Sequence, residues 1–257
     1  MFGEVAELYH QRRPGYPAAL VDDLVEWAGE GGGAPTALEV GAGTGKATQL
    51  LAARGVTVLA IEPSAEMAAV ARRVTAELGD VVIVESDFEH WRPAGRTFPL
   101  VYAAQAWHWV DQESGYAHAR EALAPGGRLV TFWNRPAWAD TQLREALSAA
   151  YRRTIPDLPP DGPMHPDNDA TAIDDTYWPA RVAATEGLAD PRRRVYRWST
   201  EYTAQEYVEL LETMSEVRVL GERERAALIR AVRETIESCG GRLTMPMVVH
   251  VDLARAV

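Results

Sequence analysis

The feature that most constrains the fold is a regular alternation of short apolar runs with amphipathic runs of helical periodicity. It predicts strands at residues 37–40, 56–61, 81–84, 100–103 and 128–133, and helices at 17–28, 46–54, 64–78 and 116–123. Repeated strand–helix–strand units form a parallel sheet with helices on both faces. We therefore predict an α/β fold.

The alternation stops at residue 135 and resumes near 191. The intervening segment, which contains "TIPDLPPDGPMHPDNDATAIDD", is rich in proline, aspartate and glycine, and a loop this long predicts a lid, a binding insertion or disorder. A strand at 193–198, a helix opened by a Thr203–Glu206 capping box, a helix at 222–238 and a strand at 243–253 follow. We expect one domain, with a core of residues 1–134 and 191–257 and an inserted lid at 135–190.

Composition narrows the classes of function. The 257 residues carry a net charge of −11, which gives no basic field for nucleic acid, so a small-molecule partner is expected. A single cysteine, acidic residues near the start and no apolar run approaching about 20 residues predict a soluble, cytoplasmic protein with no membrane contact. No Cys/His cluster has metal-ligand spacing, and the aspartates of 157–175 stand among prolines, so no metal is predicted.

Three alternate glycines, Gly41, Gly43 and Gly45, follow the first predicted strand in "ALEVGAGTGKAT". A dinucleotide fingerprint would place its third glycine at Lys46. A phosphate-binding P-loop would need glycine at Val40 and Ser or Thr at Ala47. Neither pattern fits, which leaves a tight turn or a loop that a ligand other than a pyrophosphate approaches closely.

Two further strand ends carry groups suited to an adenosine. Glu62 ends the second predicted strand, where a carboxylate can accept hydrogen bonds from both ribose hydroxyls. Asp87 follows the third strand and can accept from an exocyclic amine, while Phe88 packs on a base. Together with the glycines they indicate an adenosine site without a phosphate clamp.

The series "LEVGAGTG", "AIEPSAEM", "ESDFE" and "APGGRL" resembles, in order and spacing, the motifs of class I S-adenosylmethionine-dependent methyltransferases over about residues 37–133. The resemblance implies a Rossmann-like, mostly parallel seven-stranded sheet with one antiparallel strand and helices on both faces, and S-adenosylmethionine as cofactor. "AELYHQRRPGYP" and "AQAWHWVD" further resemble the subgroup containing trans-aconitate methyltransferase.

The resemblance also implies a set of cofactor-binding residues. Glu39 and Gly41 would lie near the methionine portion, and Tyr9 and Arg13, in an arm with neither helical nor strand periodicity, would fold over the cofactor. Arg13 would pair with its carboxylate; a solvated surface charge is the alternative. The full set is Tyr9, Arg13, Glu39, Gly41, Gly43, Gly45, Glu62, Pro63, Met67, Asp87, Phe88 and Gln105.

The acceptor is expected beyond the fourth and fifth strands, because ligands of open α/β sheets bind at the carboxyl ends of strands. His108 is the candidate general base, with a structural role between two tryptophans as the alternative. Large aromatic side chains of the insertion and the segment after it would either roof the acceptor pocket or form a small core of the lid; these are Trp138, Tyr177, Trp178 and Trp198. The substrate-binding candidates are Trp107, Trp109, Trp133, Asn134 and Arg135.

These residues predict methyl transfer to a small-molecule acceptor, at a carboxylate or hydroxyl oxygen rather than at carbon or nitrogen. Two other classes stay open: a protein that binds S-adenosylmethionine without transferring its methyl, and an RNA methyltransferase that uses the basic run "RRRVYR" at 192–197. A monomer or homodimer is expected.

Overall fold

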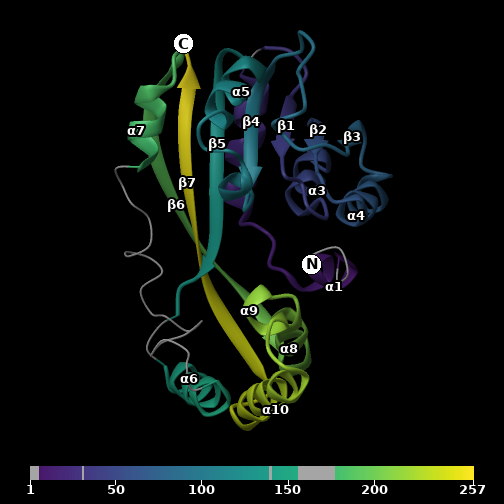
Figure 1. Cartoon of the computed structure of the whole chain (residues 1–257), viewed down its shortest axis with the longest axis vertical. Coiled ribbons are helices and arrows are strands. Elements are labelled where there is room, and N and C mark those ends of the chain that lie inside the picture. The colour runs from purple at the N-terminus through teal and green to yellow at the C-terminus, as the bar shows by residue number, and fades with distance from the viewer. Residues whose placement is uncertain (1–5, 31, 139–140, 156–176) are drawn as a thin grey trace.

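A seven-stranded sheet forms the centre of the computed structural model, which describes residues 6–30, 32–138, 141–155 and 177–257. The strand order is β3-β2-β1-β4-β5-β7-β6, and β7 runs antiparallel to its neighbours β5 and β6 while the other pairs are parallel (Figure 1). The strands are β1 Thr36–Val40, β2 Thr57–Ile61, β3 Val81–Val84, β4 Phe98–Ala104, β5 Leu123–Pro136, β6 Leu188–Thr203 and β7 Arg242–Ala256. The predicted class I fold is confirmed.

Helices surround this sheet and gather below it. They are α1 Ala6–Arg12, α2 Ala18–Gly29, α3 Lys46–Ala52, α4 Ala65–Thr75, α5 Gly115–Ala122, α6 Gln142–Thr154, α7 Tyr177–Ala184, α8 Ala204–Glu212, α9 Ser215–Arg218 and α10 Glu222–Ser238. Local sequence fixes several of their starts. Ser64 accepts a hydrogen bond from the Met67 amide at 3.3 Å and caps α4, and Thr203 with Glu206 forms the predicted capping box of α8.

Each face of the upper sheet has its own core. On one face Leu24 of α2 and Leu51 of α3 pack with Tyr102 and Phe132, and all four side chains are buried. On the other face α5 and α7 cover the sheet, with Tyr116 of α5 and Trp178 of α7 in the buried cluster. The alternation of side chains along the strands therefore buries both faces, as a helix-covered sheet requires.

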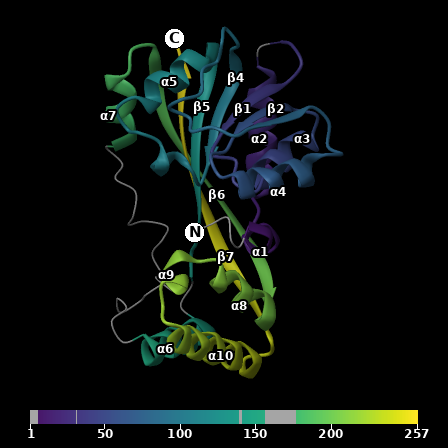
Figure 2. The same cartoon turned by 45° about the vertical axis from the view of Figure 1, so that its right-hand side comes forward.

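A second helical body lies below the sheet, at the ends of the long strands β5, β6 and β7 (Figures 1 and 2). Leu147 of α6, Leu211 of α8 and Leu228 of α10 share a buried cluster with Met245 of β7. The parallel strands point their carboxyl ends down toward this body, and α1 lies between the two parts (Figure 1). The division into a core and an inserted lid stays a prediction.

Two expectations about irregular backbone were wrong. The N-terminal arm contains α1, which packs Ala6 and Tyr9 on Met67 and Val70 of α4. The segment from 135 to 191 contains α6 and α7; α6 begins where the Thr141 hydroxyl accepts from the Arg144 amide at 3.1 Å. All three helices are stabilised by burying one face on partners distant in sequence. Residues 156–176 of this segment, with the aspartates of 157–175, lie outside the described residues.

Candidate cofactor and acceptor site

The glycine loop turns sharply between β1 and α3. Gly41, Gly43 and Gly45 all have positive φ, at 71°, 57° and 79°, a backbone conformation that side chains with a Cβ rarely adopt. The Gly41 and Ala42 amides both donate to the Ile61 carbonyl oxygen, at 2.9 and 3.0 Å, so the loop is tied to the end of β2. A Cβ added at Gly43 would meet no atom within 4 Å. The loop therefore has open space at its middle glycine.

Glu62 stands beside this loop at the end of β2. Its Oε2 accepts from the Gly43 amide at 2.7 Å and its Oε1 accepts from the Ser64 amide at 2.9 Å. Burial raises the pKa of Glu62, while the two amides favour the ionised form. Each carboxylate oxygen offers two acceptor positions, so both retain one for a ligand hydroxyl. This fits the predicted ribose contact.

Glu39 is a buried carboxyl group near the end of β1, two residues before Gly41. Its Oε2 accepts from the Thr48 hydroxyl at 2.5 Å and from the Tyr102 hydroxyl at 2.8 Å. Its Oε1 has no hydrogen-bond partner, although the side chain is only 1% exposed. Burial raises the pKa of Glu39 to about 7. A buried acceptor oxygen without a donor fits a ligand that brings its own, such as the amino group of S-adenosylmethionine.

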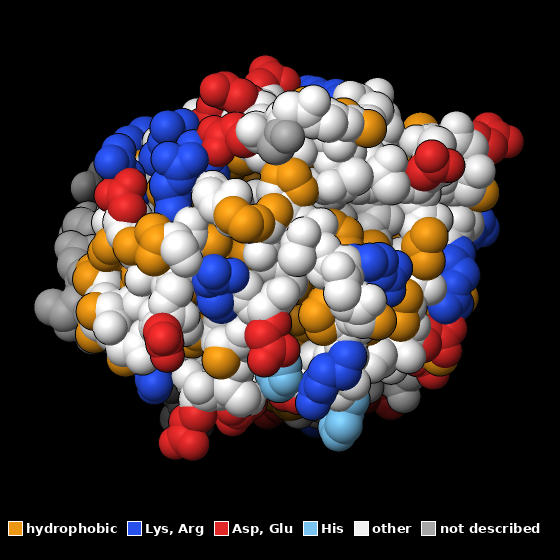
Figure 3. All heavy atoms as spheres, turned by 90° about the horizontal axis from the view of Figure 1, so that it is seen from above, with side chains coloured by type: hydrophobic (Ala, Val, Ile, Leu, Met, Phe, Trp, Pro, Cys, Tyr) orange, Lys and Arg blue, Asp and Glu red, His pale blue; other side chains and the backbone are white. Residues whose placement is uncertain are grey.

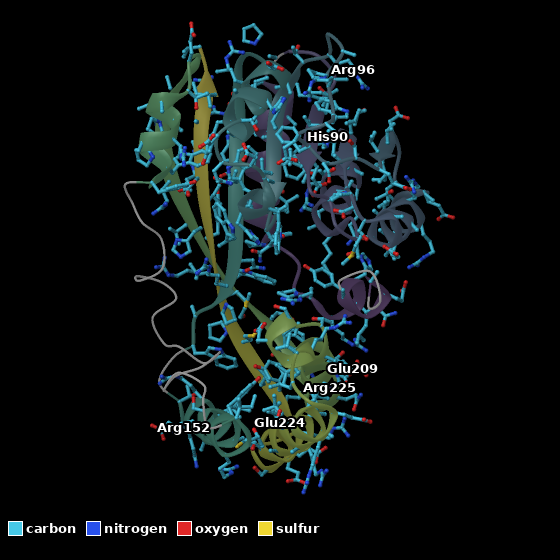
Figure 4. All side chains as sticks on the ribbon, in the orientation of Figure 1. His90, Arg96, Arg152, Glu209, Glu224 and Arg225 are labelled. Atoms are coloured by element: carbon cyan, nitrogen blue, oxygen red, sulfur yellow. The ribbon has the colours of Figure 1, made fainter. Side chains whose placement is uncertain are left out.

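The arm reaches both the loop and the lower helices. His10 lies 3.2 Å from the Thr44 hydroxyl, measured from Nδ1. Arg13 donates to the Thr213 hydroxyl and to the Thr213 carbonyl, both at 3.0 Å, and stacks on Tyr9. Arg12 forms an ion pair with Glu209 of α8, which Figure 4 labels. The partner of Arg13 is thus a helix end rather than bulk solvent, and its contact with a cofactor carboxylate stays a prediction.

The residues expected at the adenine and along α4 occupy different environments. Asp87 is exposed and pairs with His90, Oδ2 to Nδ1, at 3.2 Å. The Phe88 ring is buried, with the rings of Trp91 and Trp107 centred 6.4 and 6.2 Å away. Pro63 is exposed, whereas Met67 is buried beneath α1. Their cofactor contacts stay predictions.

A cavity of about 370 Å³ lies beyond β4 on the face covered by α5 and α7. It brings together four of the predicted acceptor-side residues, Trp107, His108, Trp133 and Arg135. The remaining lining residues are Gln112, Tyr116, Tyr177, Trp178, Arg193 and Asp252. Trp107 follows directly after Ala106, and Ala106 packs against Gly41, so the cavity starts next to the glycine loop.

Three other candidates do not line this cavity. Trp109 is 72% exposed. Asn134 donates from Nδ2 to the Gly15 carbonyl at 2.8 Å and accepts from the Trp198 indole at 3.2 Å, so it fastens the arm to the sheet. Gln105 has φ of 63° and donates to the Asn134 carbonyl at 2.8 Å.

His108 lies at the rim of the cavity near Arg135. Burial, and next the positive charge of Arg135, lower the pKa of His108 below its usual value. Its ring centre lies 4.9 Å from that of Trp109. The imidazole is therefore held in its neutral form at neutral pH.

Several lining residues were missed from the sequence. Tyr116 sits at the start of α5, and Arg193 and Asp252 face each other across β6 and β7. Side chains alternate between the two faces of β7, so Asp252 lies on the other face of the sheet from Val251 and Leu253, which belong to a buried cluster. This alternation is the sequence signal that could have identified Asp252. The aromatic residues split between the two alternatives: Tyr177 and Trp178 line the cavity, whereas Trp138 belongs to the lower cluster.

Comparison with known proteins identifies the family. A methyltransferase domain model matches residues 37–127. An uncharacterised methyltransferase of Geobacillus sp. strain WCH70 is 32% identical over 163 residues, covering 60% of this chain and 71% of that protein. An uncharacterised methyltransferase of Mycobacterium tuberculosis strain H37Rv is 38% identical over 133 residues, covering 52% of this chain. The chain belongs to the class I S-adenosylmethionine-dependent methyltransferases.

The matches differ in how much of each protein they cover. The chain spans about half the length of the mycobacterial relative, 51%. A solved putative type II methyltransferase from Anaeromyxobacter dehalogenans superposes with a TM-score of 0.56 at 21% identity, covering 95% of this chain and 97% of that one. This structural likeness shows a shared fold.

The hydropathy, the metal-binding side chains and the charges of the described residues bear on the other predictions. No helix there is long and apolar enough to cross a membrane, and no group of three or more His, Cys, Asp or Glu side chains there is placed to hold a metal ion. In the basic run, Arg192 pairs with Asp190, Arg193 with Asp252 and Arg194 with Asp23. On the upper end of the molecule, acidic and basic side chains are interspersed (Figure 3).

Proposed function

We propose that this protein transfers a methyl group from S-adenosylmethionine to an oxygen of a small-molecule acceptor, and that this oxygen belongs to a carboxylate. The observation that carries the proposal is the cavity beside the glycine loop, which combines aromatic walls with the guanidinium of Arg135. Arginine matches a carboxylate with two parallel hydrogen bonds. Trp107 and Trp133 supply apolar surface for the rest of the acceptor.

Two carboxylates that would hold the cofactor have oxygen atoms that can still accept hydrogen bonds. Glu62 would accept from the ribose hydroxyls, and Glu39 Oε1 would accept from the methionine amino group. Asp87 and Phe88 would face the adenine, and Tyr9 and Arg13 would close over the bound molecule. Glycine at 43 leaves the space that this approach needs.

When bound, S-adenosylmethionine supplies a methyl carbon activated by its sulfonium: an oxygen lone pair forms the new C–O bond, the C–S bond breaks, and its electrons neutralise the sulfur. A carboxylate acceptor loses no proton in this step, so its product is a neutral ester. Arg135 would orient the carboxylate, and the cavity would exclude water. His108 would then position the acceptor, whereas a hydroxyl acceptor would require it as a general base.

Specific observations bear on the alternatives. The arginines at 192, 193 and 194 are paired with carboxylates, which disfavours an RNA methyltransferase. The cavity lined by aromatic rings and Arg135 favours turnover over simple cofactor binding, because it offers a site to an acceptor. Membership in the subgroup that resembles trans-aconitate methyltransferase and a monomeric or homodimeric state are further proposals. C- or N-methylation of a small metabolite is the alternative to the oxygen acceptor.

The test is formation of S-adenosylhomocysteine. The protein is incubated with S-adenosylmethionine and a cell extract fractionated by charge, and each methylated product is exposed to mild base, which cleaves methyl esters but not methyl ethers. We expect product in the anionic fractions and its loss in base. Tight cofactor binding with no product in any fraction would contradict the enzymatic proposal, and a base-stable product would contradict the carboxylate.

A further inference from the structure

We infer that the acceptor is an aromatic acid with a hydroxyl group at the end opposite its carboxylate, and that Asp252 and Tyr116 recognise this hydroxyl. The inference rests on the proposed function, because it places the carboxylate at Arg135. It concerns the other end of the same cavity, where polar groups lie buried among aromatic rings.

Asp252 is a buried carboxylate at that inner end. It is 4% exposed and receives two hydrogen bonds from Arg193, Nε to Oδ1 at 2.7 Å and Nη2 to Oδ2 at 3.1 Å. Each oxygen therefore keeps acceptor capacity on a side that lines the cavity. A buried ion pair in a sheet rarely stabilises the fold relative to apolar residues, so a binding role accounts better for its presence.

Tyr116 and Trp107 bring unpartnered polar atoms to the same end. Both side chains are 2% exposed, and the Tyr116 hydroxyl and the Trp107 Nε1 lie next to each other without a hydrogen bond of good geometry to any described protein atom. The two rings pack edge to face with centres 5.2 Å apart. Leaving a buried donor unpaired costs about 1–3 kcal/mol, so a ligand atom that satisfies it gains that much in affinity.

The register of the sheet sets the length of the cavity. Arg193 and Asp252 lie in one row with Thr131, and Arg135 stands four residues further along β5. Four residues of a strand span about 13 Å. Trp133 lies midway, and the Trp178 ring centre is 5.6 Å from that of Tyr116. This spacing suits one aromatic ring on a short acid chain.

The donor and acceptor pattern favours a hydroxyl over an amine. A phenolic hydroxyl donates to Asp252 and accepts from the Tyr116 hydroxyl or the Trp107 indole. An ammonium could donate but not accept, and Arg193 already neutralises the charge of Asp252. A hydroxyl satisfies the unpartnered groups without adding a charge.

The experiment measures binding apart from turnover. Protein saturated with S-adenosylhomocysteine is titrated by calorimetry with 3-(4-hydroxyphenyl)propionate and with 3-phenylpropionate, which differ only in the hydroxyl. We expect the hydroxylated acid to bind about 10- to 100-fold more tightly. Equal affinity for the two acids, or no binding of either, would overturn the inference.

Two tyrosine variants test whether the Tyr116 hydroxyl causes the preference for the hydroxylated acid. Tyr116→Phe removes a hydroxyl whose one polar neighbour is the Trp107 indole, so the fold should be retained while the preference for the hydroxylated acid falls toward unity. Tyr151→Phe is the matched control, because the Tyr151 hydroxyl is also buried, also has a polar neighbour, Tyr207, without a bond of good geometry, and lies in the lower cluster. A preference that survives in Tyr116→Phe would contradict the inference.

Turnover separates this inference from the proposed function. If the hydroxylated acid binds preferentially but yields no S-adenosylhomocysteine from S-adenosylmethionine, the recognition of the hydroxyl stands and methylation of that carboxylate does not. If an acceptor from the extract is methylated at a carboxylate while neither propionate binds, the proposed function stands and this inference fails.

Discussion

Gly41 and Ala106 lie so close that a Cβ built on residue 41 would stand 2.4 Å from the Cβ of Ala106. Gly41 follows β1 and Ala106 follows β4, and these strands are neighbours in the sheet. The contact brings the loop expected to hold the cofactor beside the first residue of the acceptor cavity, Trp107. Methyl transfer requires such proximity, because both reactants must reach one point.

Substitutions at two glycines of the loop should have different outcomes, because Gly41 contacts Ala106 whereas Gly43 faces open space. Gly43→Val should leave the protein folded, at a cost of about 1–2 kcal/mol for positive φ, and abolish S-adenosylhomocysteine binding by filling open space. Gly41→Ala should lower the melting temperature more strongly, because its Cβ collides with Ala106. Thermal unfolding and calorimetry measure both. Normal turnover in Gly43→Val would refute the role of the loop.

Removing the Glu62 carboxylate should weaken cofactor binding. We expect Glu62→Ala to lose about 1.5–3 kcal/mol for each charged hydrogen bond to the ligand, while the protein stays folded. The exposed Glu77, just beyond α4, provides the control Glu77→Ala, which should bind normally. Unchanged affinity of Glu62→Ala in calorimetry would remove the ribose assignment.

Glu39 should make stability depend on pH. Its pKa is about 7 in the folded protein against an ordinary value of 4.5, so the folded state binds the proton more tightly. Its stabilising contribution is complete below about pH 4.5 and is lost as pH rises to about 7, by up to about 1.4 kcal/mol per pH unit. Urea unfolding at pH 5, 6 and 7 should show this slope reduced in Glu39→Gln. Parallel pH profiles in the two proteins would exclude Glu39 as its source.

His108 and Arg135 should differ in their effects on turnover. For a carboxylate acceptor, Arg135→Ala should reduce kcat/KM about 10- to 100-fold through lost charged hydrogen bonds, and His108→Ala should reduce it less than about 10-fold. Since the pKa of His108 is lowered, activity should be flat above pH 7. A loss of about 100-fold or more in His108→Ala alone, dependent on pH, would indicate a hydroxyl acceptor instead.

Cofactor binding should order the arm. The arm contacts the glycine loop through His10 of α1 and Thr44, and it contacts the end of α8 through Arg13 and Thr213. Hydrogen exchange of residues 6–13 and of the described part of the predicted lid should therefore slow when S-adenosylhomocysteine is added. Helix α10 serves as an internal reference. Unaltered exchange in both segments would count against closure.

Most of the core could be predicted from the sequence. Apolar alternation located β1 to β5 and the helices between them, and the glycines with Glu62 predict the loop that we propose to hold the cofactor. These features are local: periodicity follows from helix and strand geometry, and positive φ favours glycine regardless of distant contacts. The capping residues Ser64 and Thr203 are local in the same way.

The acceptor cavity and helix α1 depended on tertiary structure. Only the sheet register places Asp252 opposite Arg193, and only the packing of α5 and α7 brings Tyr116 and Trp178 to Trp107. α1 is seven residues long and has little helical stability of its own, so its contact with α4 decides its conformation. The fold class and the glycine loop follow from the sequence alone, because strand and helix periodicity and the placing of glycines are local properties. The residues that line the proposed acceptor cavity follow from the tertiary structure, because side chains from β4 to β7 meet there only after the chain has packed.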